Sequence, residues 1–175
     1  MLTNQEMQQV MDEYAGYLVQ LSYLYVKDVQ LAEDIVQESF IKYFKAPENF
    51  ERRATLKTYL SRIVIHTSLD YLRSWQARKR MLLKLVQHEP KSFVATPADA
   101  LQHKLEQTEL MQHVLALSLK YREVIILFYY EEMTSLEIAE LLTISENTVK
   151  TRLRRAREQL KARMNEQDWE VLQDE

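Results

Sequence analysis

Basic side chains are concentrated between residues 149 and 164, where seven Lys and Arg accompany a single acid, Glu158. Lys and Arg donate hydrogen bonds to guanine acceptors and to phosphates, and Thr can pair with either kind of base edge. Apolar residues recur every three or four positions in the same segment, which predicts a helix with one buried stripe. This stripe comprises Val149, Leu153, Ala156, Leu160 and Met164. A helix that is buried on one side and basic on the other is suited to binding a polyanion.

The residues before this helix predict a shorter helix and a tight turn. Thr134 and Glu137 have the spacing of a capping box, which starts a helix over 135–142. Thr143 opens the turn, and Ser145 is positioned to cap the basic helix over 146–165. Two helices joined in this way form a helix-turn-helix, whose second helix enters the major groove of DNA. The alternative is a basic surface helix of no particular function.

The positions on this recognition helix divide into two groups. Only the first two turns of such a helix reach base edges, so we expect Lys150, Thr151 and Arg154 to contact bases. The surrounding basic residues are expected to contact phosphates, which position the helix without specifying sequence. These residues are Arg152, Arg155, Arg157 and Lys161.

A second basic block lies between residues 52 and 88, which hold nine Lys and Arg against one acid, Asp70. It also contains the aromatic residues Tyr59, Tyr71 and Trp75. Aromatic faces with nearby cations bind unstacked bases, so the block could hold single-stranded nucleic acid. Aromatic residues at helical spacing more often belong to a core, and spacing alone favours that reading. The four His of the chain are scattered and have no carboxylates at ligand spacing, so we expect no metal site.

An acidic helix is expected over 29–45, with Asp28 as its N-cap. Its polar face carries Glu33, Asp34, Gln37 and Glu38, opposite the apolar Val36, Phe40, Tyr43 and Phe44. An acidic face is unsuited to DNA. It is either a surface that docks another protein or a solvated face, and the pattern does not choose between them.

The composition predicts an all-α fold of two small helical domains. One Gly and three Pro leave little turn material for a β fold, and 46% apolar residues suffice for two cores. There is no Cys, which excludes disulfides and zinc–thiolate sites. No leader or long apolar run is present, so we expect a cytoplasmic protein that does not insert into a membrane.

The domain boundaries follow from a segment without helical periodicity, 88–100, which contains Pro90 and Pro97 and is expected to be a flexible linker. The N-terminal domain is expected over 1–87, the helix-turn-helix domain over 101–165 and an acidic tail over 166–175. Besides the helices named above, helices are expected over 4–26, 55–86, 101–117 and 120–131.

Several segments, in order along the chain, resemble motifs of one family. Ala32-Glu-Asp-Ile-Val-Gln-Glu-Ser-Phe40 is similar to the core-polymerase-binding helix of bacterial alternative sigma factors of the extracytoplasmic-function group. Leu56–Ile63 and Leu69–Arg73 are similar to the segment that reads the minus-ten promoter element. Tyr121–Val124, Glu137–Leu142 and Thr148–Arg157 are similar to the domain that reads the minus-35 element. Each motif is moderately specific, and the ordered set is highly specific.

This resemblance implies an alternative sigma factor, which binds core RNA polymerase, recognises promoter DNA as duplex and as single strand, and helps to open it. Asp34, Gln37, Glu38 and Phe40 would dock on the clamp coiled coil of the polymerase. The minus-ten strand would lie along Thr58, Tyr59, Arg62, His66, Asp70 and Arg73, and loop 46–54 would capture a flipped base. An anti-sigma factor is a further partner common in the family. Such a protein is no enzyme and needs no cofactor.

The chain departs from the family pattern at four positions. Tyr59 replaces the usual Trp and His66 a common Asn, which bears on the minus-ten preference. Ser118 replaces a Pro before the minus-35 domain, and Thr143 replaces the turn Gly. A β-branched residue would then adopt a positive φ unless the turn differs.

Two other functions compete with this assignment. A stand-alone repressor or activator would use only the helix-turn-helix and would bind its operator without polymerase. An enzyme acting on nucleic acid would need clustered carboxylates or His near a basic block, and the sequence offers no such cluster at usable spacing.

Overall fold

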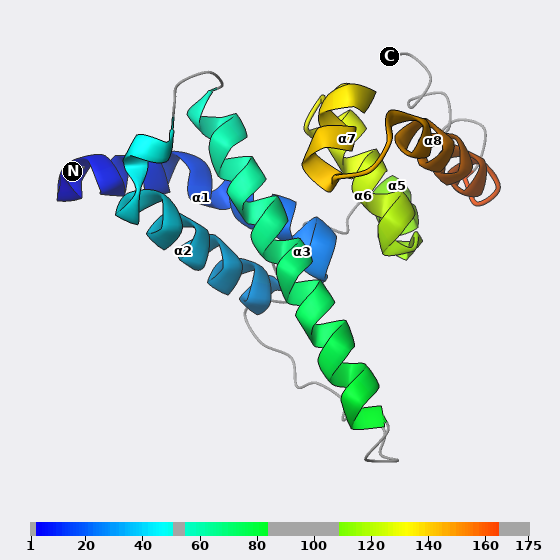
Figure 1. Cartoon of the computed structure of the whole chain (residues 1–175), viewed down its shortest axis with the longest axis horizontal. Helices are drawn as coiled ribbons and strands as arrows, with labels where there is room; N and C mark the ends of the chain where they lie inside the picture. The colour runs from blue at the N-terminus through cyan, green and yellow to red at the C-terminus, as the bar shows by residue number, and fades with distance from the viewer. Residues whose placement is uncertain (1–2, 51–54, 84–108, 165–175) are drawn as a thin grey trace. The chain divides into compact units, whose positions relative to one another are not determined.

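The computed structural model describes residues 3–50, 55–83 and 109–164, and every regular element within these ranges is helical (Figure 1). The chain divides into an N-terminal and a C-terminal unit, and each is considered by itself. The expected linker and the acidic tail lie outside the described residues.

Within residues 3–50 and 55–83, the N-terminal unit has the helices α1 (Asn4–Val26), α2 (Val29–Lys45) and α3 (Leu56–Leu83). Each of them packs against the other two (Figure 1). Their apolar faces form one core, whose fully buried members include Leu18, Leu21, Tyr23, Leu60 and Val64. Burying side chains of this size stabilises a fold by about 1.5–3 kcal/mol each.

Caps and a buried polar pair fix the helix ends and register of this unit. The Asp28 carboxylate accepts a hydrogen bond of 2.9 Å from the Leu31 amide, as the sequence predicted for the start of α2. The hydroxyls of Ser22 and Ser68 lie 3.1 Å apart in the core, joining α1 to α3. Pro47–Asn49 form a single 3-10 turn after α2.

The C-terminal unit contains α5 (Glu109–Ala116), α6 (Leu119–Ile125), α7 (Ser135–Leu142) and α8 (Glu146–Lys161). α6 continues directly into a π-helical segment, Ile126–Tyr130. α8 packs against α6 and α7, and α5 packs against α6. The apolar stripe predicted for α8 lies in this core, with Val149, Leu153, Ala156 and Leu160 each at most 3% exposed.

The helix boundaries agree with the sequence predictions to within a few residues where the structure describes them, and four helices differ at an end. The helix expected over 55–86 begins at Leu56, and residues 84–86 lie outside the described residues. α8 ends at Lys161 rather than 165, where the Arg163 amide bonds at 2.9 Å to the Leu160 carbonyl, only three residues back, and tightens the last turn. The helix expected over 120–131 begins at Leu119 and finishes as the π-helical segment. The helix expected over 101–117 is described from Glu109 and ends at Ala116.

Candidate nucleic-acid and polymerase interfaces

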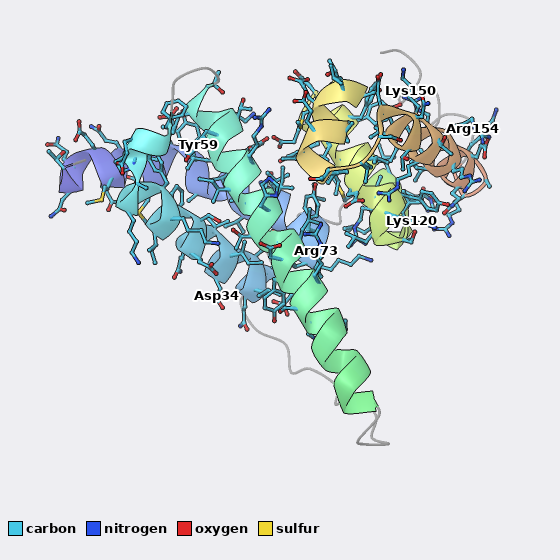
Figure 2. All side chains as sticks on the ribbon, in the orientation of Figure 1. Asp34, Tyr59, Arg73, Lys120, Lys150 and Arg154 are labelled. Carbon is cyan, nitrogen blue, oxygen red and sulfur yellow. The ribbon has the colours of Figure 1, made fainter. Side chains whose placement is uncertain are left out.

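The N-terminal half of α8 presents the side chains that were expected to read bases. The Ser145 hydroxyl accepts a hydrogen bond of 3.1 Å from the Thr148 amide, which caps the helix as predicted. Since Val149 and Leu153 face the core, Lys150, Thr151 and Arg154 lie on the exposed side. Figure 2 labels Lys150 and Arg154 on this helix.

Two of these side chains pair with acids on the same helix. Lys150 Nζ lies 2.8 Å from Glu146 Oε1, and Arg154 Nη1 lies 2.6 Å from Glu158 Oε1. Both pairs span four residues and are exposed to solvent. Exposed pairs of this kind contribute only about 0.3–0.5 kcal/mol each, so a phosphate or base edge can displace the carboxylate.

The four expected phosphate contacts separate into two exposed and two internal side chains. Arg155 and Lys161 are exposed. Arg152 Nη1 instead donates a hydrogen bond of 2.7 Å to Glu123 Oε1 of α6, and the Glu123 side chain is only 11% exposed. The charge of Arg152 is thus compensated inside the unit, and its expected phosphate contact stays a prediction.

Arg157 is also engaged within the unit. Its Nε donates a hydrogen bond of 2.8 Å to the Tyr129 hydroxyl, and its guanidinium lies 5.3 Å from the centre of the Phe128 ring. These contacts attach α8 to the π-helical segment. A phosphate contact by Arg157 would break them, so the structure favours a packing role.

Sequence reasoning missed the buried Arg122. Its Nη1 donates to the backbone carbonyls of Leu115 and Leu117, at 3.1 and 3.3 Å. These carbonyls lie at the end of α5 and just after it, so Arg122 holds the connection from α5 to α6. The available signal was a charged pair, Arg122-Glu123, just before the apolar run 124–128.

Thr143 adopts the strained turn conformation that its position required. Its φ is 55° and its ψ 48°, in the left-handed region that a β-branched residue rarely occupies. The Ile144 amide donates back to the Ala139 carbonyl at 3.0 Å, which is the bond of a Schellman motif. This turn places α8 directly after α7, whose capping box between Thr134 and Glu137 is also present.

Replacing Thr143 with Gly should stabilise the C-terminal unit by about 0.5–1 kcal/mol, because Gly adopts a positive φ without a steric penalty. Hydrogen exchange of the amides of 109–164 would measure the gain. Glu140→Gly, within α7, is the matched control and should destabilise the unit by about 1 kcal/mol. A loss of stability in Thr143→Gly would show that the Thr side chain contributes more than the strain costs.

α3 carries the residues that the family resemblance assigned to the minus-ten strand. Arg62, His66, Asp70 and Arg73 are exposed at intervals of three and four residues, which places them along one face. Arg73 Nη1 lies 3.4 Å from Asp70 Oδ1 in an exposed pair. Thr58 belongs to the first turn, where its amide donates to the Thr55 hydroxyl at 3.1 Å. The structure therefore brings the assigned residues of α3 into one row.

Tyr59 is half-buried among other aromatic rings. Its ring centre lies 5.2 Å from that of Phe50 and 6.1 Å from that of Tyr43. Tyr59 therefore packs and remains partly accessible, while Trp75 is 46% exposed. Figure 2 places Tyr59 near the start of α3 and Arg73 further along it. Residues 51–54 of the expected base-capturing loop lie outside the described part of the chain.

The outer face of α2 is acidic, as expected, but Phe40 is not part of it. Asp34, Gln37 and Glu38 are exposed, whereas Phe40 is 3% exposed and stacks on Phe44 with ring centres 5.8 Å apart. The Phe40 side chain is covered in the core, and its expected docking contact stays a prediction.

An apolar groove beside this face was not foreseen. It has a volume of about 530 Å³ and lies between the start of α1 and the second half of α2. Met7, Met11 and Phe44 line it, Phe40 is covered within its wall, and Ile41 at its edge is 52% exposed. The combination of an acidic row and an apolar groove is typical of a protein-docking surface.

The described part of the chain has neither a metal-binding cluster nor a membrane-spanning helix. Within residues 3–50, 55–83 and 109–164, no group of three or more His, Asp and Glu could hold a metal ion. No helix in these ranges is both long and apolar enough to span a bilayer.

Comparisons with known proteins decide the family. The family model described as Sigma-70 region 2 matches residues 10–79, and that described as Sigma-70, region 4 matches residues 107–160. The ECF RNA polymerase sigma factor SigW of Bacillus subtilis is 30% identical over 164 residues, covering 90% of this chain and 88% of SigW. The chain belongs to the ECF sigma factors. It is thus an alternative sigma factor, which directs promoter recognition together with core RNA polymerase.

Other relatives agree with this assignment. The RNA polymerase sigma factor SigV of Bacillus subtilis is 30% identical to this sigma factor, covering 85% of the chain and 84% of SigV. The fold of this chain is similar to that of the sigma factor RpoE of Bartonella quintana, whose structure was solved in complex with the anti-sigma factor NepR. The TM-score is 0.63 and the sequence identity 21%. That likeness covers 90% of this chain and 96% of RpoE. The helices α1–α3 belong to region 2, and α5–α8 belong to region 4.

Proposed function

We propose that this sigma factor reads the minus-35 element with α8, holds the minus-ten strand along α3, and docks on the clamp coiled coil of the polymerase through α2. The observation that carries the proposal is the exposed face of α8, where Lys150, Thr151 and Arg154 sit in a capped and packed recognition helix. The row of exposed polar residues on α3 and the acidic face of α2 support the other two assignments. The domain limits 1–87 and 101–165, with the linker 88–100, belong to the same proposal.

Run-off transcription tests this function directly. The full chain would be combined with core RNA polymerase and fragments of the source genome, and we expect specific transcripts that core alone does not produce. The start sites would give the minus-ten and minus-35 sequences. Tight operator binding by the isolated protein, with no polymerase-dependent transcripts, would instead identify a stand-alone regulator.

The base-reading assignment makes a prediction for Lys150 and Arg154. Replacing either with Ala should relax the preference at particular minus-35 positions, at a cost of about 1–3 kcal/mol for the preferred base. Binding of the holoenzyme to a set of single-base promoter variants measures this. Lys161→Ala is the control and should weaken all variants by the same factor. A uniform loss in Lys150→Ala or Arg154→Ala would reassign that residue to phosphate.

The α3 row supports a role in strand opening. Arg62 and Arg73 supply positive charge, and Tyr59 and Trp75 supply partly exposed aromatic faces on which unpaired bases could stack. His66 lies in the middle of this row. We propose that these side chains hold the minus-ten strand once it separates.

The remaining assignments rest on the family. Of the solved structures of similar fold, RpoE is in complex with the anti-sigma factor NepR and CnrH with the cytosolic domain of CnrY, and we propose an anti-sigma partner here. The relatives are sigma factors, which are not enzymes. We propose likewise that this chain has no catalytic activity and acts in the cytoplasm, where its polymerase is, in a response to stress.

A further inference from the structure

A polar pocket of about 370 Å³ opens between the first turn of α6 and the first half of α8. Lys120 and Tyr121 line it from α6, and Thr151, Arg152 and Arg155 line it from α8. Lys120 is labelled on α6 in Figure 2. None of the minus-35 assignments above uses the α6 side of this pocket.

Three cationic side chains line the pocket, Lys120, Arg152 and Arg155, and of these Arg152 is paired with an acid. The charge of Arg152 is matched by Glu123, at 2.7 Å. Lys120 Nζ lies 4.8 Å from the centre of the Tyr121 ring, so the ring orients the ammonium group beside the pocket. A hydrogen bond with Arg155 lowers the pKa of the Tyr121 hydroxyl, and the charge of Lys120 acts in the same direction. The two cations and the phenol therefore make a local environment that favours an anion.

Helix geometry places the pocket beside the base-reading face. With 3.6 residues per turn, Thr151 and Arg155 lie one turn apart on the side of α8 that faces α6. Lys150 and Arg154 project from the other side of Thr151. Thr151 thus borders both the pocket and the base-reading face. The major groove is about 12 Å wide and is bordered by two phosphate backbones, so a helix lying in it has phosphates on each side.

We propose that Lys120, Tyr121 and Arg155 form a seat for one backbone phosphate of the DNA strand that borders α8. The seat deepens the proposed minus-35 recognition and rests on it. It adds α6 to the contact, so that DNA is held by two helices rather than one. A phosphate fixed at this edge sets the rotation of α8 about its own axis, and with it the base position that Thr151 meets. Lys120 and Tyr121 are accordingly positioning residues.

The salt dependence of binding by the full chain tests whether Lys120 contacts phosphate. With a short duplex of arbitrary sequence, Lys120→Met should make the slope of log affinity against log salt shallower by about one. At about 0.1 M salt this corresponds to about an eightfold loss of affinity, because one fewer counterion is released. Lys45→Met, an exposed Lys at the end of α2, is the matched control and should change neither quantity. Equal behaviour of the two variants would overturn the proposal.

Replacing single phosphates of the DNA with uncharged groups would show which phosphate occupies the seat. Holoenzyme binding would be measured on promoter duplexes carrying one methylphosphonate at each position in turn. We expect one or two adjacent positions where the substitution weakens the unaltered protein but has no further effect on Lys120→Met or Arg155→Met. Tyr121→Phe should reduce the penalty at the same position without changing the protein's charge. Losses that add at every position would show that these residues act only through the general field, and would refute the seat.

The two experiments separate the seat from the proposed function. If run-off transcription yields no promoter, the sigma-factor role of α8 fails, while the slope on arbitrary duplex still reports on Lys120. If transcription succeeds and Lys120→Met behaves like Lys45→Met, the function stands and the seat is wrong. Binding of inorganic phosphate by the pocket, with unaltered DNA affinity in Lys120→Met, would assign it to a free anion and likewise reject the seat.

Discussion

Reversing the charges of Asp34 and Glu38 to Lys should abolish binding of the full chain to core RNA polymerase. Both carboxylates are exposed on α2, beside the apolar groove at Ile41, so a docked partner would bury them together. Placing two positive charges at positions that a partner complements with its own cations costs several kcal/mol, enough to lower the affinity by about a thousandfold or more. Co-elution of the variant with core polymerase on size exclusion measures the loss.

A matched variant separates docking from net charge. Glu13→Lys with Glu140→Lys makes the same change in total charge at two exposed positions on other helices, α1 and α7, and should bind core normally. Circular dichroism should show unchanged helix content in both double variants. Glu38 also pairs with Lys42 at 2.8 Å, but this exposed pair contributes too little to unfold the helix. Normal core binding by Asp34→Lys, Glu38→Lys would contradict the docking assignment.

Replacing Arg152 with Met should destabilise the C-terminal unit by about 3 kcal/mol. The substitution leaves Glu123 largely buried without its partner, and removing one member of a buried pair costs about 3–5 kcal/mol. The lower end of this range applies because the Arg152 side chain keeps 25% exposure, so solvent already screens part of the interaction. Hydrogen exchange of the amides in 109–164 would report the loss.

Arg155→Met should affect DNA binding rather than stability, the reverse of Arg152→Met. Arg155 is exposed, so its loss should change stability by less than about 0.5 kcal/mol while weakening DNA binding. Combining Arg152→Met with Glu123→Met should restore part of the lost stability, because no charge is then left uncompensated. If Arg152→Met weakened DNA binding without affecting hydrogen exchange, the phosphate contact expected from the sequence would be correct after all.

Local signals predicted most of the helix boundaries. Asp28, Thr134 and Ser145 each begin a helix where the sequence expects it, since a capping side chain bonds to an amide only three residues away. Hydrophobic periodicity likewise predicted the buried stripe of α8. On α2, periodicity placed Phe40 on the apolar face and the family resemblance placed it in the docking surface, and the structure agrees with periodicity.

Contacts between residues far apart in the sequence could not be predicted from capping residues or hydrophobic periodicity. The partners of Arg152 and Arg157 lie 29 and 28 residues earlier in the chain, so nothing in the basic helix itself distinguishes an internal arginine from one that faces DNA. The π-helical segment Ile126–Tyr130 also has no simple sequence pattern, because its apolar and aromatic residues suit an ordinary α-helix equally well. The groove beside α2 could not be predicted from the sequence, because it forms only where α1 packs against α2.

The carboxylates of Glu146 and Glu158 neutralise Lys150 and Arg154 on the same helix. In free α8 these two cations are therefore paired with side chains rather than with ions from the solvent. A carboxylate displaced by DNA stays tethered to the helix, so its release gains none of the mixing entropy that a freed sodium ion would gain. The salt sensitivity of α8 should therefore be smaller than its number of basic residues implies. Non-specific sites, which offer only phosphate charge, lose most from this arrangement. The sigma factor would accordingly leave unrelated DNA sooner and spend less of its time away from polymerase.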